Sequence, residues 1–302
     1  MAETIGVGVI GMGWMGIVHS RCYLRVGQHF PDLNLRPRLI ICADEVADRS
    51  REAKDRFGFE RQTSNWQEVI ADPDVEIVNI AAPNSMHLEI VQAAAEAGKH
   101  IFCEKPPGRN VADIKNVITK ENQNPQLKLM YGFNHRYHES VKDALSMMHS
   151  GELGKPINLR GVYGKSKLIT FNQPDWRTNR EISGGGVLLD QGIHMVDLMR
   201  LFGGEFFEVH SFISNSHWKH DVEDNAYALM RSSEGVIAML NSSATQWRHR
   251  FHLDINFELG SLILSGNLTG TKSYGEETLT IVRADPDNDR GDQKEQMTRN
   301  NK

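Results

Sequence analysis

The sequence has 302 residues, of which 39% are hydrophobic and 24% charged, a composition typical of a soluble globular protein with one large domain or two ordinary ones. Asp and Glu outnumber Lys and Arg by 39 to 34, and the net charge of −5 argues against nucleic acid or an anionic membrane as the main partner. The sequence contains no apolar run of the roughly 18 residues that a membrane span needs.

The start of the chain and its cysteines indicate where the protein works. A strand is expected almost at once after Met1, which leaves no room for a signal peptide. The three cysteines, Cys22, Cys42 and Cys103, lack CxxC spacing and are typical of free buried thiols in a reducing compartment. We therefore expect a cytoplasmic protein, and we expect no metal site because the histidines and cysteines show no ligand spacing.

A glycine motif follows the first apolar run. Residues 7–10 read as a buried strand, and a helical pattern begins after residue 16. Gly11, Gly13 and Gly16 form a G-x-G-x-x-G motif, whose glycines permit a tight turn, close approach of a pyrophosphate and close helix–sheet packing. Three such glycines are often only a turn, but the strand and helix around them favour a dinucleotide site. The predicted cofactor loop consists of Gly11, Met12, Gly13, Trp14, Met15 and Gly16.

An acidic residue ends the second predicted strand. Gly and Pro residues in 26–37 predict a loop, and residues 39–43 form an apolar run that ends at Asp44. In a dinucleotide fold, an acid at this position hydrogen-bonds the adenosine ribose and repels a 2′-phosphate. Asp44 therefore favours NAD over NADP, although it could instead only cap the helix that begins at Glu45.

The first half of the chain alternates between strands and helices. Strands are expected over 74–82, 100–105 and 127–133, and helices over 45–57, 88–97 and 111–120. This alternation predicts an α/β Rossmann domain with a doubly wound parallel sheet over residues 1–132. Ligands bind at the carboxyl ends of such strands. The polar residues at these ends are Asp44, Asn84, Glu104 and Lys105, with His87 one turn later, and for Asn84 and His87 helix capping is an equally good interpretation.

The second half of the chain is dominated by extended segments. Extended segments are expected over 157–167, 206–218, 225–231, 236–244, 251–259, 262–264 and 278–282. They predict an α+β domain over 133–282 with a mostly antiparallel sheet. Residues 283–302 hold only Ala284 and Met297 as apolar side chains, so we expect a polar, mobile tail.

One helix, expected over 187–202, combines charges with an apolar surface. Asp190, His194 and Asp197 are spaced i, i+4, i+7 and share one face, while the rest of the helix is apolar and therefore buried. The charged face is either a self-satisfied Asp–His pair or a proton-transfer histidine oriented by carboxylates. Three glycines, 184–186, precede the helix and favour the second interpretation, because they clear space for a ligand.

Together these motifs resemble the glucose–fructose oxidoreductase/inositol dehydrogenase (Gfo/Idh/MocA) family. The resemblance rests on Gly11–Gly16, Asp44, Ala82-Pro83-Asn84 with His87, Glu104-Lys105-Pro106, Arg136, and the Gly185–Asp197 stretch with its Asp-x-x-x-His. It implies a Rossmann domain followed by a substrate and oligomerisation domain over 133–282. That domain has a large, open, mostly antiparallel sheet whose face often forms an oligomer contact, here a homodimer or homotetramer. It also implies cofactor binding by Ala82, Pro83, Asn84, His87, Glu104 and Lys105, and catalysis by Lys105, Asp190 and His194. Family members commonly continue beyond the sheet, whereas this chain ends in the polar tail, so we expect either a shortened sequence or a trimmed fold.

The chemistry of these residues agrees with the family's redox activity. Lys105 can stabilise a developing alkoxide, His194 can transfer a proton, and Asp190 can orient the histidine. We therefore expect an NAD-dependent oxidoreductase that moves a hydride between nicotinamide and a hydroxyl or ketone of a sugar, polyol or nucleotide-linked sugar. Substrate contacts are expected from Asn134, Arg136, Trp176, Arg177, Asp190 and His194.

The positive charges in and around residues 174–180 have two interpretations. Arg177 and Arg180, with Arg136, Arg160, Lys165 and Lys167, either recognise an anionic group such as a diphosphate or form a solvated loop. Alternative functions are a non-catalytic NAD or sugar sensor and an NAD-dependent glycoside hydrolase.

An apolar sheet face is expected to drive self-association through Val236, Ile237, Met239, Phe251, Leu253, Ile255 and Phe257.

Overall fold

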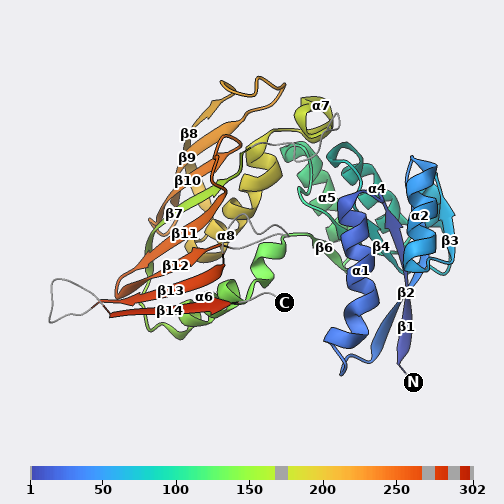
Figure 1. The fold of residues 1–302 in the computed structure, drawn as a ribbon, viewed down its shortest axis with the longest axis horizontal. Helices are drawn as coiled ribbons and strands as arrows, with labels where there is room; N and C mark the ends of the chain where they lie inside the picture. The colour runs from blue at the N-terminus through green and yellow to red at the C-terminus, as the bar shows by residue number, and fades with distance from the viewer. Residues whose placement is uncertain (1, 167–175, 267–275, 285–292, 300–302) are drawn as a thin grey trace. The chain divides into compact units, whose positions relative to one another are not determined.

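The computed structural model describes residues 2–166, 176–266, 276–284 and 293–299. The chain divides into two compact units, Met1–Gly132 (unit 1) and Phe133–Lys302 (unit 2). Figure 1 shows the elements of each unit in chain order.

Unit 1 is built on a six-stranded parallel sheet. Its elements are β1 (Glu3–Ile10), α1 (Trp14–His29), β2 (Leu35–Ala43), α2 (Ala47–Phe57), β3 (Arg61–Thr63), α3 (Trp66–Ala71), β4 (Ile77–Ile80), α4 (Asn84–Glu96), β5 (His100–Cys103), α5 (Val111–Gln123) and β6 (Leu129–Tyr131). The strand order is β3-β2-β1-β4-β5-β6, and all neighbouring pairs are parallel. This is the order of a doubly wound dinucleotide-binding sheet, so the predicted fold of this half is confirmed.

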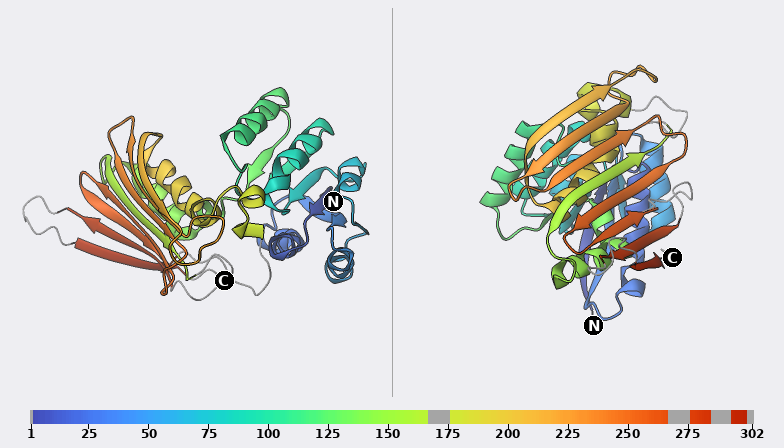
Figure 2. Two further views of the ribbon diagram at one scale, coloured as in Figure 1. Left: turned by 90° about the horizontal axis from the view of Figure 1, so that it is seen from above. Right: turned by 90° about the vertical axis from the view of Figure 1, so that its left-hand side faces the viewer.

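Helices cover both faces of this sheet, as the left view of Figure 2 shows. On one face, Val9 packs in a core with Phe57 of α2. On the other, Ile80 packs with Ile90 of α4 and Val117 of α5. The sheet is therefore buried on both sides, and its near-continuous apolar strands follow from that burial. None of the helices in the described ranges is long and apolar enough to cross a membrane.

The loop expected over 26–37 is shorter in the structure. Helix α1 continues through Gly27 to His29, and β2 begins at Leu35 and includes Pro37. One glycine lowers helix stability by only about 1 kcal/mol and does not end the helix. Strand β3 pairs with β2 only over residues 41–43, so at Pro37 β2 is an edge strand, where proline is tolerated.

Unit 2 combines a large sheet with a few helices. Its elements are η1 (Asn134–Tyr137), α6 (Glu139–Ser150), β7 (Pro156–Gly164), η2 (Trp176–Thr178), α7 (Arg180–Ser183), η3 (Leu188–Gly192), α8 (Ile193–Gly203), β8 (Phe206–Ser214), β9 (Asn225–Ser232), β10 (Ile237–Ser243), β11 (Arg250–Phe257), β12 (Gly260–Ser265), β13 (Glu277–Arg283) and β14 (Gln293–Arg299). The sheet order is β14-β13-β12-β11-β7-β10-β9-β8. Strands β7 and β10 are parallel, and the other neighbouring pairs are antiparallel. The predicted open, mostly antiparallel sheet is confirmed.

The apolar residues that were expected on the open face of this sheet are mostly in its core. Val236, Phe251, Leu253, Ile255 and Phe257 are buried in the core cluster that also includes residues of α6 and α8. That part of the expectation is wrong, because an alternating strand does not reveal which of its two faces points inward. The open face does carry exposed apolar side chains, which we call the outer apolar patch: Phe212, Tyr227, Leu229, Ile237 and Met239. The right view of Figure 2 looks onto these strands.

The polar tail contains an additional strand. Strand β14 pairs antiparallel with β13, and Met297 lies opposite Leu279 and packs against the core. This pairing differs from the mobile tail that the composition predicts. Backbone hydrogen bonds do not require apolar side chains, and a polar sequence is usual for a strand at a sheet edge.

Candidate active site

The loop between β1 and α1 has the geometry of a pyrophosphate site. Gly11 has a φ of +90°, and Gly16 is so close to the turn that an added Cβ would lie 1.9 Å from the Gly11 carbonyl oxygen. At Gly13 an added Cβ would meet open space. No side chain caps α1, and no acidic residue occupies its first turn. The backbone N–H groups of this helix start are therefore placed to bind phosphate oxygens, and the loop fits a dinucleotide.

Asp44 is tied to this loop. Its Oδ2 accepts a hydrogen bond from the Met12 amide at 2.8 Å, and its Oδ1 accepts one from the Val46 amide at 2.9 Å. The Arg49 guanidinium lies 3.8 Å away. Asp44 therefore joins the end of β2 to the glycine loop, a role beyond the ribose-binding and capping alternatives. Within the same loop, the Met12 side chain is buried and Trp14 is exposed.

His87 links the loops that follow β4 and β5. Its Nδ1 lies 2.9 Å from the Pro106 carbonyl oxygen, and its Nε2 lies 2.9 Å from the Ala82 carbonyl oxygen. Burial lowers the pKa of the His87 ring, and the contacts with the two carbonyls oppose this shift. The ring thus connects the loop that ends at Pro83, just before α4, to the loop that carries Lys105. Asn84 is buried and is the first residue of α4.

Glu104 contacts a histidine of α1 that was not predicted to belong to the site. The His19 Nε2 lies 2.7 Å from Glu104 Oε1, and the Lys105 amide donates to Glu104 Oε2 at 3.2 Å. His19 lies on α1 three residues after Gly16. This position, close to the glycine motif, is the sequence feature that could have suggested a role for His19 at the site. Helix α1 is therefore coupled to the strand end that carries Lys105.

The helix expected over 187–202 is interrupted in unit 2. Asp190 lies in a π-helical turn, η3, whereas His194 and Asp197 lie on α8. A π turn changes the side-chain spacing, and such turns are frequent at functional sites. The i, i+4, i+7 face is therefore not that of one regular α-helix.

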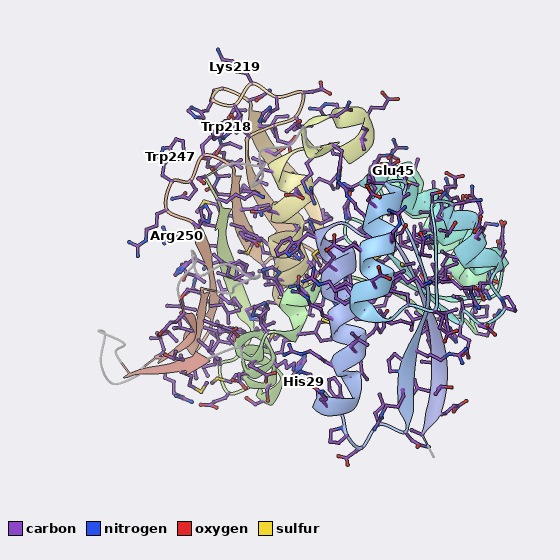
Figure 3. All side chains as sticks on the ribbon, turned by 45° about the vertical axis from the view of Figure 1, so that its right-hand side comes forward. His29, Glu45, Trp218, Lys219, Trp247 and Arg250 are labelled. Atoms are coloured by element: carbon purple, nitrogen blue, oxygen red, sulfur yellow. The ribbon has the colours of Figure 1, made fainter. Side chains whose placement is uncertain are left out.

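The glycines before this turn have a structural partner. Both Glu223 oxygens accept from the Gly186 amide at 2.9 Å, and Oε1 also accepts from the Leu188 amide at 3.2 Å. A Cβ on Gly186 would lie 2.1 Å from the Glu223 carbonyl oxygen. The interpretation that this glycine clears space for a ligand is therefore wrong, since the Glu223 backbone occupies that space. Trp218, labelled in Figure 3, packs against the small core cluster of Val187, Val222 and Ala244.

The carboxylates of the helix are paired with cations from other elements. Lys165 Nζ lies 3.3 Å from Asp190 Oδ2, and Arg177 Nε lies 3.4 Å from Asp190 Oδ1. Arg136 forms a bidentate pair with Asp197, with contacts of 2.7 and 2.6 Å. The two charged ends of the His194 face are thus fixed by ion pairs.

His194 lies among aromatic rings. It is 6% exposed, and its ring centroid lies 4.4 Å from that of His135, 6.1 Å from that of Phe133 and 6.4 Å from that of Tyr163. His135 was not expected at this site. Its only signal was the run Asn134-His-Arg-Tyr-His138, which contains two histidines.

The remaining expected substrate residues lie in several places. Asn134 begins η1, and the Arg177 guanidinium stacks 4.5 Å from the Trp176 ring centroid. Arg180 donates to Asp221 through its amide and its Nε. Arg160 is exposed on β7, opposite Asp254 of β11 on the open face of the sheet, and so does not join the Asp190 cluster. Residues 167, 174 and 175 lie outside the described residues.

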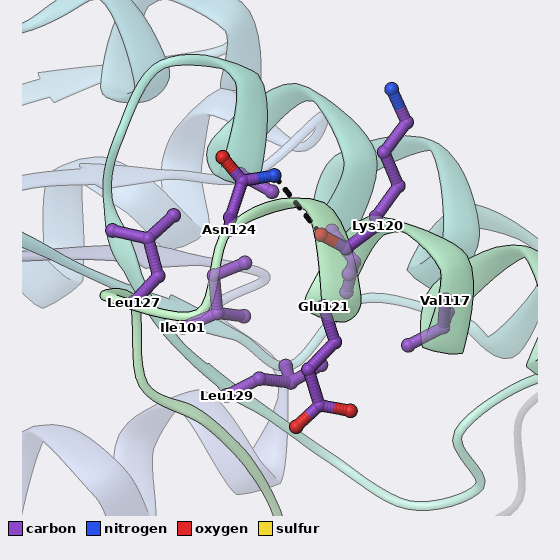
Figure 4. Close-up of a pocket in the computed structure, with 9 residues that line it drawn as sticks. Ile101, Val117, Lys120, Glu121, Asn124, Leu127 and Leu129 are labelled. Carbon is purple, nitrogen blue, oxygen red and sulfur yellow. Dashed lines mark hydrogen bonds between the residues drawn. The ribbon is translucent and has the colours of Figure 1, made fainter.

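A small pocket in unit 1 is not a competing site. Figure 4 shows it between α4, α5 and β6, with mostly apolar lining residues and the Asn124 side-chain amide bonded to the Lys120 carbonyl oxygen. Its volume of about 10 Å³ is too small for a sugar. Within the described ranges, no group of three or more His, Cys, Asp or Glu side chains is arranged to hold a metal ion.

Both units match models of one protein family. Residues 5–133 match the model described as an oxidoreductase family with an NAD-binding Rossmann fold, and residues 141–263 match the GFO/IDH/MocA C-terminal domain. The two matches follow the order of the two units along the chain.

Individual relatives are named as sugar and polyol dehydrogenases. Levoglucosan dehydrogenase of Pseudarthrobacter phenanthrenivorans is 37% identical over 213 residues, which is 70% of this chain and 54% of that protein. Myo-inositol 2-dehydrogenase of Thermotoga maritima is 29% identical over 94% of this chain and 80% of that protein. The solved structure of levoglucosan dehydrogenase in complex with NADH and levoglucosan matches with a TM-score of 0.88 and 28% identity, over 98% of this chain and 80% of that one.

Proposed function

The chain belongs to the Gfo/Idh/MocA family of NAD-binding oxidoreductases, and from that premise we propose that it is an NAD-dependent dehydrogenase or reductase of a neutral sugar or polyol. The glycine loop, the start of α1 and Asp44 would hold the dinucleotide in unit 1. Bound there, NAD supplies the hydride acceptor or donor. The protein supplies positioning, charge and proton transfer.

Lys105, Asp190 and His194 are the catalytic residues of this proposal. Lys105 follows β5 at the carboxyl edge of the sheet, where its ammonium group would stabilise negative charge on the substrate oxygen. His194 would take the proton from the hydroxyl in oxidation and return it in reduction. Asp190, one turn before His194, would fix the polar surroundings of the ring through its ion pairs with Lys165 and Arg177.

Charge pairing in unit 2 is the observation that carries the substrate class. Arg136 is neutralised by Asp197, and Lys165 and Arg177 share Asp190. At Arg136, binding a diphosphate or carboxylate would require breaking the bidentate pair and leaving the buried Asp197 without its cation, which is costly. A polyhydroxy substrate can instead hydrogen-bond to the paired groups as they stand. This supports a neutral sugar or polyol over a nucleotide-linked sugar.

A substrate screen tests this proposal. Neutral cyclic polyols, monosaccharides and anhydrosugars, sugar acids and nucleotide sugars are incubated with NAD, and NADH formation is followed by absorbance. We expect turnover with members of the neutral set and at least about tenfold lower kcat/KM for the anionic analogues of the same ring, about 1.4 kcal/mol of discrimination. Turnover confined to anionic substrates would contradict the substrate class. NADH binding without turnover of any compound would favour the sensor.

We also propose that the protein forms a homodimer or homotetramer through the outer apolar patch. Phe212 is 82% exposed, and Tyr227, Leu229 and Met239 are about half exposed on neighbouring strands. A contiguous apolar surface of this kind is typical of an interface. Because a two-fold interface presents the same patch on both partners, one charge introduced into the patch acts on both sides of the contact.

Leu229→Glu should therefore dissociate the oligomer. The charge would lie at the centre of the patch, beside Met239, and a buried unpaired carboxylate opposes association. The molar mass, measured by light scattering at micromolar concentration, should fall to that of the monomer. Ile118→Glu on α5 is the matched control, since Ile118 is also exposed but belongs to unit 1. A wild-type monomer, or an unchanged mass for Leu229→Glu, would contradict the assignment.

The cytoplasm is the proposed location. The proposed reaction draws on an NAD pool, and the structure has free thiols at Cys22, Cys42 and Cys103, which are typical of a reducing compartment.

A further inference from the structure

The side chain of His19 reaches from α1 to the end of β5. Its Nε2 lies 2.7 Å from Glu104 Oε1, and its ring meets the Phe102 ring in a T-shaped contact with centroids 5.0 Å apart. Tyr23, one turn further along α1, donates a hydrogen bond to Asn79 of β4 at 3.2 Å. One face of α1 is therefore held against β4 and against the end of β5.

The Glu104 carboxylate lies between this histidine and the backbone of Lys105. Glu104 is 8% exposed, and its Oε2 accepts a hydrogen bond from the Lys105 amide at 3.2 Å. A Cβ on Gly132, just after β6, would lie 3.1–3.2 Å from the carboxyl atoms, so the carboxylate rests against bare backbone there. Loss of the His19 ring would deprive this nearly buried carboxylate of a hydrogen-bond partner, which is unfavourable.

The backbone is held on both sides of Lys105. The preceding residue, Glu104, is bonded to His19 of α1. The carbonyl oxygen of the following residue, Pro106, lies 2.9 Å from His87 Nδ1 of α4. The lysine side chain therefore starts from a short segment whose two ends are fixed by two different helices.

We propose that His19 is a positioning residue for Lys105. By holding the Glu104 carboxylate, it fixes the backbone from which the lysine ammonium group reaches the substrate oxygen. The geometry favours this role over direct contact with dinucleotide or substrate, because the nitrogen at the tip of the ring is already bonded to Glu104. The inference rests on the proposed role of Lys105. Because a misplacement of about 1 Å can cost about 10²-fold in rate, loss of His19 should act mainly on kcat.

Hydrogen exchange, resolved to single residues by mass spectrometry, tests the positioning without a substrate. The Lys105 amide should exchange about fivefold faster in His19→Ala than in the wild type, because the carboxylate that it binds is released. The amides of β1 should be unchanged. An unchanged Lys105 amide in His19→Ala would overturn the inference.

Three further variants separate the hydrogen bond from the bulk of the ring. His19→Gln places an amide donor near the position of Nε2 and should restore most of the wild-type protection of the Lys105 amide. His19→Asn, whose shorter side chain reaches only the position of Nδ1, should resemble His19→Ala. His29→Ala, at the exposed end of the same helix and labelled in Figure 3, is the matched control and should change nothing. Equal exchange in the Gln and Asn variants would contradict the inference.

Kinetics then tests the connection to Lys105. His19→Ala should lower kcat about tenfold and change the dissociation constant of NADH, measured by fluorescence titration, by less than about threefold. In a Lys105→Ala background the same change should cause no further loss of kcat, because the residue that His19 positions is gone. A full further loss in that background, or NADH binding weakened as much as kcat/KM, would overturn the inference and assign His19 to the dinucleotide site. Failure of the proposed function would appear differently, as undiminished turnover in Lys105→Ala.

Discussion

Replacement of His194 by alanine should lower kcat by about 10²–10⁴-fold, the usual loss when a general acid/base is removed. The ring is buried on α8 beside His135 and Phe133. The dissociation constant of NADH, measured by fluorescence titration, should change little because the dinucleotide motif lies in unit 1. His210→Ala, at an exposed position of β8, removes a histidine from the same unit and should leave kcat unchanged.

Lys105→Ala should cause a loss of similar size and should also weaken NADH binding. Lys105 follows β5 at the carboxyl edge of the parallel sheet, and its amide donates to Glu104, which His19 contacts from α1. A lost ammonium group removes the charge that stabilises the developing alkoxide. Lys99→Ala removes a lysine of the same unit that bonds the Asp72 and Val75 carbonyl oxygens, and it should alter stability with little change in kcat.

The double variant decides whether the two residues act on one oxygen. If they do, Lys105→Ala combined with His194→Ala should lower kcat/KM by less than the product of the single losses, because each single change already disables the same step. Multiplicative losses would indicate independent roles. A His194→Ala variant with normal turnover would remove the mechanism altogether.

Local sequence signals predicted the first half of the fold well. The glycine motif, the apolar runs and the helix stops of unit 1 each act within a few residues, and the parallel sheet follows from their alternation. Pro37 shows the limit of this reasoning, because its tolerance in β2 depends on how far β3 extends beside it. The residues near the proline do not predict how far the neighbouring strand extends.

Local sequence patterns did not predict the contacts that site residues make with residues distant in sequence. The sequence around Gly186 suggests space for a ligand. In the structure that space is occupied by Glu223, which lies 37 positions further along the chain. Asp190 and His194 look like a pair, but the structure gives Asp190 two cations, Lys165 and Arg177. The sequence therefore suggested candidate residues for the site, whereas their charge partners could be identified only from the fold.

The inward and outward faces of the second sheet show the same limit. Phe251 and Leu253 are core residues, and Tyr227 and Leu229 are exposed, although all four belong to apolar segments of similar appearance. The side on which α8 packs fixes which face is buried, and alternation alone is symmetrical between the two faces.

Asp44→Ser should narrow the preference for NAD over NADP by about one to three decades. A 2′-phosphate about 4–5 Å from the Asp44 carboxylate would be opposed by about 1–4 kcal/mol. The structure adds a second effect, because Asp44 also accepts hydrogen bonds from the Met12 and Val46 amides. The substitution should therefore weaken binding of both dinucleotides while it removes the discrimination between them.

Arg49 makes this prediction sharper. Its guanidinium lies 3.8 Å from Asp44, and without the carboxylate it would be able to pair with a 2′-phosphate. Asp44→Ser should thus gain NADP affinity relative to NAD, and the further change Arg49→Ala should reverse part of that gain. Asp48→Ser removes an equal charge from the exposed first turn of α2 and should leave the preference unchanged. Dissociation constants of both reduced dinucleotides, measured by fluorescence titration, give the ratio directly. Tighter binding of NADPH than NADH by the wild-type protein would assign Asp44 to holding the glycine loop alone.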